Sequence, residues 1–185
     1  MLFRSGSTGN CRVDNLIQSN GSAHPVIASP LNLLAYGGFE SANYTAEWTL
    51  AGATPAVRSN AQAHSGTWSL SLPGAIGNSP SAFTTVPCRP GQYCQGEFWY
   101  LSATITGTSA TFYAEVDYLD KAGNSLSTNV LLAITANVAA WTRLGFKVAT
   151  PAPAGTVSAK LYFSVFGIAA GNATSYVDDI VVNVI

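Results

Sequence analysis

Charged side chains are scarce in this sequence. Of its 185 residues, 8 are Lys or Arg and 9 are Asp or Glu, and the formal net charge is −1. With no basic stripe to neutralise phosphates, nucleic acid is not an expected partner. No apolar run approaches the length of a transmembrane helix, so we expect no membrane anchor. The first 15 residues hold no apolar core for a secretory signal, so either the protein is not secreted by that route or a signal was removed before this numbering begins.

Cysteine and histidine are also rare. The three cysteines are Cys11, Cys88 and Cys94, and their odd number argues against a disulfide framework. Cys88 and Cys94 flank the turn 89–92 and would pair if a hairpin brought them together. We favour two buried thiols in a protein assembled in a reducing cytosol. Neither His24 nor His64 lies at zinc-ligand spacing, so no zinc site is expected.

Apolar residues are plentiful, at 48% of the chain, which excludes a disordered protein. They recur at every second position in a series of short runs, which predicts strands with one buried face. The runs are 67–72, 94–101, 111–119, 157–166 and 176–185. The residues that we expect to point inward are Cys94, Gly96, Phe98, Tyr100, Phe112, Ala114, Val116, Tyr118, Val157, Ala159, Leu161, Phe163 and Val165.

Turn sequences separate these runs, at 64–66, 89–91, 120–124 and 151–155. Segment 129–140 has the composition of a helix, but its Val and Ile content favours a strand followed by a loop. Many short strands without an amphipathic helix predict an all-β sandwich or barrel.

Residues 1–31 differ from the rest of the chain. They are rich in Ser, Gly and Asn, contain scattered apolar residues, and show no strand or helix period. We interpret this segment as an extended N-terminal arm whose apolar side chains favour contact with a partner surface. The alternative is a flexible terminus.

Several landmarks in the remaining residues, 32–185, stand in a familiar order. They are NLLAYGGFE at 32–40, AHSGTWSLSL at 63–72, PGQYCQGEFWYL at 90–101 and YVDDIVV at 176–182. This order resembles the jelly-roll carbohydrate-binding modules of xylanases and glucanases, and the similar domains of phage tail and virion proteins. Two departures are Tyr36, where the family usually has Asn, and a more polar strand at Gln95 and Glu97. The resemblance implies a jelly-roll β-sandwich of two antiparallel sheets over 32–185.

The same resemblance implies a structural calcium ion between the first and last strands. The matching carboxylates are those of Glu40, Asp178 and Asp179, and backbone carbonyls near the His64 turn would complete the six to eight oxygens that Ca²⁺ requires. The alternative is that Glu40 caps a turn and that Asp178 and Asp179 are solvated at a sheet edge.

A candidate sugar-binding face combines aromatic rings for stacking with polar groups for sugar hydroxyls. The outward residues of two strands supply both, namely Gln95, Glu97, Trp99, Tyr113, Glu115 and Asp117, with Lys160 and Tyr162 outward on a third. The sequence leaves open whether these strands share a sheet. It also leaves open that Trp99 and Tyr113 cover the core edge or pack against another subunit.

Catalysis is not expected. The segment 115–120 loosely resembles the E-x-D-x-x-E motif of jelly-roll glucanases, and Glu115 and Asp117 share a face. Asp120 falls on the opposite side, stands where the motif has Glu, and opens a turn. No nucleophile elbow, P-loop or triad is present.

Three functions therefore remain open. The preferred one is a non-catalytic phage virion protein, on the capsid or the tail, anchored to other virion proteins by its arm and adhering weakly to host glycans. We expect such a chain to be a homo-oligomer or part of a larger assembly. The second is an accessory polysaccharide-binding module of a secreted glycoside hydrolase. The third is a jelly-roll glycosidase.

Overall fold

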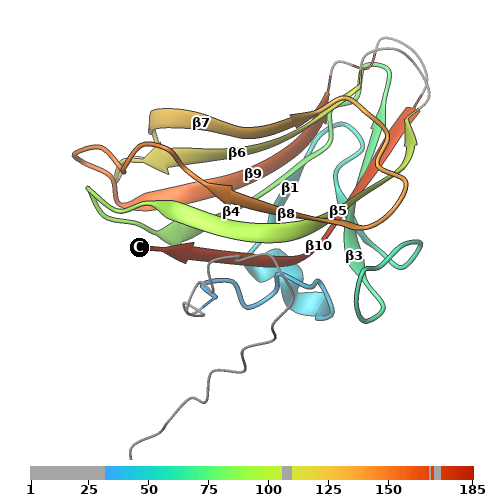
Figure 1. Ribbon diagram of the computed structural model, residues 1–185, viewed down its shortest axis with the longest axis horizontal. Helices are drawn as coiled ribbons and strands as arrows, with labels where there is room; N and C mark the ends of the chain where they lie inside the picture. Colours follow the sequence, from blue (N-terminus) through green and yellow to red (C-terminus); the bar gives the residue numbers. More distant parts are fainter. Residues whose placement is uncertain (1–31, 106–109, 167, 169–171) are drawn as a thin grey trace, which may run out of the picture.

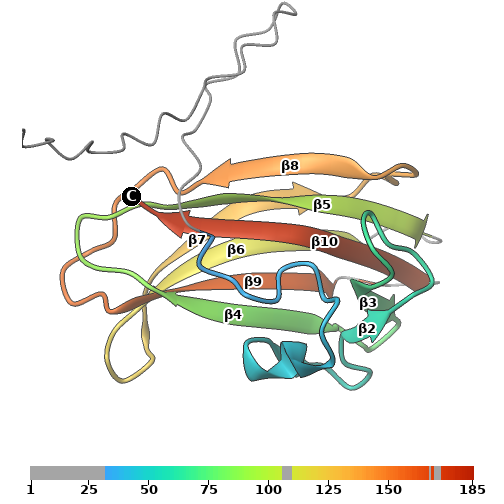
Figure 2. The ribbon, with the colours of Figure 1, turned by 90° about the horizontal axis from the view of Figure 1, so that it is seen from below.

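The computed structural model describes residues 32–105, 110–166, 168 and 172–185, and these form two antiparallel sheets stacked as a sandwich (Figure 1). Sheet A has the strand order β1-β4-β9-β6-β7 and sheet B the order β2-β3-β10-β5-β8. Figure 2, seen from below, shows β8, β5 and β10 of sheet B side by side. The predicted arm, 1–31, lies outside the described residues.

The strands of sheet A are β1 (Thr49–Ala51), β4 (Ser81–Pro87), β6 (Thr111–Leu119), β7 (Ser125–Ile134) and β9 (Ser158–Phe166). Those of sheet B are β2 (Val57–Ser59), β3 (Ser69–Ala75), β5 (Cys94–Ile105), β8 (Thr142–Lys147) and β10 (Asn172–Val184). A short 3-10 helix, η1 (Ala42–Ala46), precedes β1. No helix in the described part of the chain is long and apolar enough to cross a membrane.

The connections make this sandwich a jelly roll. From β3 onward each strand passes to the opposite sheet, except for the β6–β7 hairpin within sheet A. The predicted fold class is therefore confirmed. The segment 129–140 is also close to its prediction, because β7 ends at Ile134 and a loop follows.

Aromatic rings join the two sheets across the core. The Phe98 ring of β5 lies 4.9 Å from the Phe163 ring of β9 and 6.2 Å from the Phe112 ring of β6. Trp48, which precedes β1, stacks against Phe163 at 6.1 Å. The buried rings of Phe98, Phe112 and Phe163 come from the every-second-residue positions that the sequence predicts to point inward, whereas Trp48 was not among those positions.

The alternation is less regular at some positions. Val157 was predicted to face inward, but it is 47% exposed because β9 begins one residue later. Leu101, on the outward side of β5, is nevertheless 5% exposed.

Cys88 and Cys94 are buried free thiols, as favoured from the sequence, and burial raises the pKa of Cys94 to about 12.

Truncation of Phe98 tests the inter-sheet core. Phe98→Ala is expected to lower the free energy of unfolding by about 3–5 kcal/mol, because a fully buried ring is lost and a cavity remains. Urea unfolding followed by tryptophan fluorescence measures the change. Phe166→Ala is the matched control. Because Phe166 is 41% exposed, this substitution is expected to lower the free energy of unfolding much less. Equal losses for both variants would contradict this packing.

Candidate functional site

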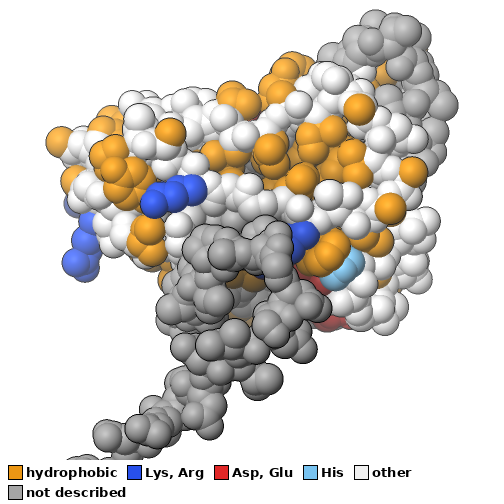
Figure 3. Space-filling view, in the orientation of Figure 1, with side chains coloured by type: hydrophobic (Ala, Val, Ile, Leu, Met, Phe, Trp, Pro, Cys, Tyr) orange, Lys and Arg blue, Asp and Glu red, His pale blue; other side chains and the backbone are white. Residues whose placement is uncertain are grey.

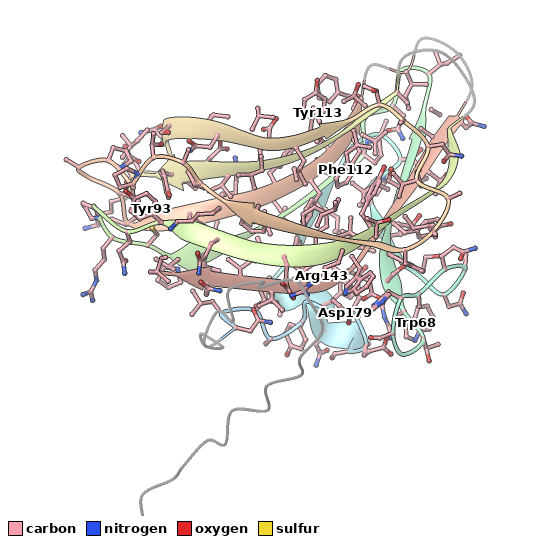
Figure 4. The ribbon with its side chains drawn as sticks, in the orientation of Figure 1. Trp68, Tyr93, Phe112, Tyr113, Arg143 and Asp179 are labelled. Atoms are coloured by element: carbon pink, nitrogen blue, oxygen red, sulfur yellow. The ribbon has the colours of Figure 1, made fainter. Side chains whose placement is uncertain are left out.

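The structure divides the six predicted sugar-binding residues between two faces. Gln95, Glu97 and Trp99 lie on β5 of sheet B, whereas Tyr113, Glu115 and Asp117 lie on β6 of sheet A. In Figure 4, Tyr113 lies on the upper side of the sandwich, and Arg143 and Asp179 lie on the lower side. The six residues therefore do not form one site. Period-two alternation tells which side of its strand a residue occupies, but not which sheet the strand joins.

The β6 residues belong to a continuous polar and aromatic surface on the outside of sheet A. The strand register aligns Phe83 of β4, Tyr162 of β9 and Glu115 of β6 in one row. The next row contains Thr85, Lys160 and Asp117 of the same strands. We call these six residues, together with Tyr113 and Phe166, the sheet A face.

Lys160 lies at the centre of the sheet A face. Its Nζ is 2.6 Å from Asp117 Oδ2 and 5.7 Å from the centroids of the Phe83 and Tyr162 rings. The two rings are themselves stacked at 6.4 Å. The ammonium group is thus fixed by a carboxylate and two aromatic faces, which gives the surface a defined shape.

A second aromatic pair lies further along the same face. The rings of Tyr113 and Phe166 stack with centroids 4.3 Å apart and an interplanar angle of 16°. Tyr113 lies opposite Ser164, two residues along β9 from Tyr162. The sheet A face therefore offers two separate aromatic platforms on neighbouring strands.

Glu115 lies between these platforms. Its carboxylate has no hydrogen-bond partner among the described residues and is half-buried. Burial raises the pKa of Glu115, and the adjacent Asp117 carboxylate raises it further, while Lys160 lowers it. Such a carboxyl group is free to bind hydroxyl groups of a ligand that lies across the rings.

The β5 residues on the opposite face already have protein partners. Glu97 forms an ion pair with Arg143 of β8, and Gln95 is buried. The His64 ring stacks on Trp99 at 3.7 Å and 12°. One face of the Trp99 ring is therefore covered by protein.

Two residues that the sequence analysis left out of the candidate face belong to this cluster, His64 and Trp141. Their rings meet edge to face at 5.8 Å. The His64-Ser65-Gly66 turn, which we call the HSG turn, is visible in the sequence, but nothing there places it over β5.

The three predicted calcium ligands all contact the HSG turn or the residues after it. Asp178 Oδ2 accepts hydrogen bonds from the backbone N–H groups of His64 (2.9 Å) and Ser65 (3.2 Å). Asp179 binds His64 Nδ1 at 2.7 Å and accepts from Ser65 Oγ at 2.8 Å. Glu40 Oε1 accepts from the backbone N–H groups of Thr67 and Trp68, at 2.9 and 2.8 Å.

Each of these carboxylates forms hydrogen bonds with N–H or O–H groups of residues 64–68. Within the described ranges no group of three or more His, Cys, Asp or Glu residues is placed to hold a metal ion. Glu40 caps a turn, as the alternative interpretation expected. The other half of that alternative is wrong, since Asp178 is fully buried on β10, an interior strand. These contacts do not test the predicted calcium binding.

Asp120 does not extend the pair Glu115 and Asp117. It is exposed in the β6–β7 turn, where Oδ1 accepts from the backbone N–H groups of Ala122 and Asn124, each at 2.8 Å. The hydrogen bond from the Asn124 side chain to Oδ2, together with these backbone bonds, holds the pKa of Asp120 below its usual value. The sequence reading of a strand that ends in an Asp-containing turn is confirmed.

Few charged side chains are visible on the side of the molecule drawn in Figure 3, where uncharged polar and hydrophobic atoms predominate.

A groove of about 320 Å³ lies between the edge strands β7 and β8. Its lining includes Val130, Leu131 and Phe146. It has no cluster of charged or polar groups comparable to that of the sheet A face.

The buried Asp178 makes stability depend on pH. Burial raises its pKa from 3.8 to about 6, although three backbone N–H groups favour the carboxylate. Between these pH values the folded state holds a proton that the unfolded chain has lost. The protonated Asp178 therefore adds to the free energy of unfolding, by at most roughly 3 kcal/mol. This contribution is fully present below about pH 4 and is lost as the pH rises through about 6.

Urea unfolding from pH 4 to 7 tests this linkage in the wild type and Asp178→Asn. As the pH rises, the unfolding free energy of the wild type is expected to fall relative to that of Asp178→Asn. Asp120→Asn, at an exposed position, controls for general charge effects. Parallel pH profiles of the wild type and Asp178→Asn would show that Asp178 does not titrate as described.

Comparisons with known proteins give matches at the level of structure. No family model matches the chain, and a search of curated proteins finds no significant relative. Among solved structures, the enzymatically active domain of tailspike protein 4 of bacteriophage CBA120 is similar with a TM-score of 0.59 and 22% identity. That match covers 83% of this chain but only 21% of the tailspike chain.

Two xylanase modules are similar over most of their length. The CBM22-1 xylan-binding domain of Paenibacillus barcinonensis Xyn10C matches with a TM-score of 0.58 and 16% identity, covering 80% of this chain and 91% of that domain. The C-terminal family 22 carbohydrate-binding module of Clostridium thermocellum Xyn10B gives 0.56 and 20%, covering 80% and 90%. At these identities the likeness establishes the fold. The chain has the jelly-roll fold found in carbohydrate-binding modules.

Proposed function

We propose that this chain is a non-catalytic glycan-binding domain of a phage virion surface protein, and that the sheet A face binds the glycan. The observation that carries the proposal is the continuous arrangement of two aromatic pairs around Glu115 and the Lys160–Asp117 ion pair. Aromatic faces stack on sugar rings, and fixed carboxylate and ammonium groups bind the hydroxyls. The jelly-roll fold shared with carbohydrate-binding modules supports this use of the surface.

We also propose that this domain is not catalytic. Retaining and inverting glycosidases need two carboxyl groups at a set separation with different protonation states. On the sheet A face, Asp117 is bound to Lys160, and Asp120 lies in a turn. Within the segment 115–120, Glu115 therefore has no second free carboxylate with which to act as a catalytic pair. The phage tailspike match is to an enzymatically active domain, but this chain spans only 21% of it.

The virion role rests on the resemblance of the sequence to phage proteins, on the tailspike match and on the weakly charged composition. In this role, the chain attaches to other virion proteins through residues 1–31 and contributes weak adhesion to host glycans. The alternative is an accessory module of a secreted polysaccharide-degrading enzyme, which the xylanase modules favour. Mass spectrometry of purified particles separates the two, because only the first role puts the chain in the virion.

Glycan binding is expected to depend on the sheet A face alone. In affinity electrophoresis against xylan, β-glucan and bacterial surface polysaccharides, Tyr162→Ala is expected to weaken binding at least about tenfold through loss of a stacking platform. Glu115→Gln is expected to weaken it less. Trp99→Ala is the matched control, because Trp99 lies on the opposite sheet and is covered by His64.

The results of these variants distinguish the alternatives directly. Loss of binding with Trp99→Ala but not with Tyr162→Ala would contradict the proposed face. Failure of the wild type to bind any glycan on a broad array would contradict glycan binding itself. Release of reducing sugars by the wild type, abolished by Glu115→Gln, would show a glycosidase instead.

A further inference from the structure

Arg58, on the edge strand β2, binds the backbone of the first described segment. Its Nε donates to the carbonyl oxygen of Phe39 at 2.6 Å, and its Nη2 donates to that of Glu40 at 2.7 Å. Phe39 has φ +54, a left-handed conformation that is unusual for a residue other than glycine. Two successive carbonyl groups thus point at one cation, and that cation is a guanidinium group.

Trp68 also contacts the guanidinium group. The Arg58 Cζ atom lies 3.8 Å from the centroid of the Trp68 ring, a cation–π contact. The backbone N–H of Trp68 in turn donates to Glu40 Oε1 at 2.8 Å. Arg58, Glu40 and Trp68 therefore form a closed set of contacts that joins the first segment to the residues following the HSG turn. We call these three residues the Arg58 clamp.

The clamp lies beside a tightly packed junction. A Cβ atom added to Gly37 would lie 2.1 Å from the carbonyl oxygen of Ile180, and one added to Gly66 would lie 2.5 Å from Glu40 Oε1. The first segment, the HSG turn and β10 are thus pressed together with little space for a further group. Asp178 and Asp179 complete the junction with hydrogen bonds to His64 and Ser65.

We propose that the Arg58 clamp takes the place of a structural metal ion at this junction, so that the domain folds and keeps its stability independently of calcium. A calcium ion requires six to eight oxygen ligands. The carbonyls of Phe39 and Glu40 are engaged by the guanidinium, and the three nearby carboxylates accept hydrogen bonds from N–H or O–H donors. Positively polarised donors occupy the positions where a cation would otherwise be bound.

The test measures the metal content and the melting temperature of the full chain. After purification without chelator and dialysis, elemental analysis is expected to find no stoichiometric calcium, and the Tm is expected to differ by less than about 1 °C between calcium and EDTA. Arg58→Ala is expected to lower the Tm by about 5–10 °C through loss of two charge-assisted hydrogen bonds and the cation–π contact. Arg58→Lys, which keeps the charge but not the fork of donors, is expected to lie between.

Arg89→Ala is the matched control, since Arg89 is exposed in the β4–β5 turn and its removal is expected to leave the Tm unchanged. One calcium ion per chain in the wild type, or a fall of about 5 °C or more on chelation, would overturn the proposal. An unchanged Tm in both Arg58 variants would overturn it as well. If Arg58→Ala does not fold, Arg58→Lys and the metal content of the wild type still decide the question.

Discussion

The structure depends on the burial of every second residue between two stacked sheets. Phe98 of sheet B meets Phe112 and Phe163 of sheet A in the centre of that layer. Because neighbouring residues on a strand point to opposite sides, burial of one set leaves the other set on an outer face. The packing of the core therefore does not fix the outward residues, and the two outer faces can carry different side chains.

The two faces differ in how far their polar and aromatic groups are already used. On sheet B, ring stacking and ion pairing tie Trp99 to His64 and Glu97 to Arg143. On sheet A, rings are stacked and Lys160 binds Asp117 in the same way, but Glu115 has no hydrogen-bond partner among the described residues. A surface whose groups are positioned but not saturated is the better binding surface, because little reorganisation is needed when a ligand arrives.

Strand positions and the fold could be predicted from the sequence because period-two alternation and turn residues are local signals. The division of the candidate face could not, because the sheet that a strand joins depends on pairing between distant segments. Glu115 lies beside Tyr162, which is 47 residues away, while Trp99 is much closer along the chain and lies on the opposite sheet. Arg58 could not be singled out from the sequence either, since a single arginine in a short edge strand carries no motif. The family resemblance grouped Glu40, Asp178 and Asp179, and all three contact the HSG turn or the residues after it, but the sequence could not show which hydrogen-bond donors surround them.

The central claim is that a glycan lies on the sheet A face. The most direct measurement is an NMR titration of the isotopically labelled chain with a glycan that it binds, with backbone amides assigned on both sheets. The largest chemical-shift changes are expected at Tyr113, Glu115 and Tyr162. The largest changes around His64, Trp99 and Trp141 instead would contradict it.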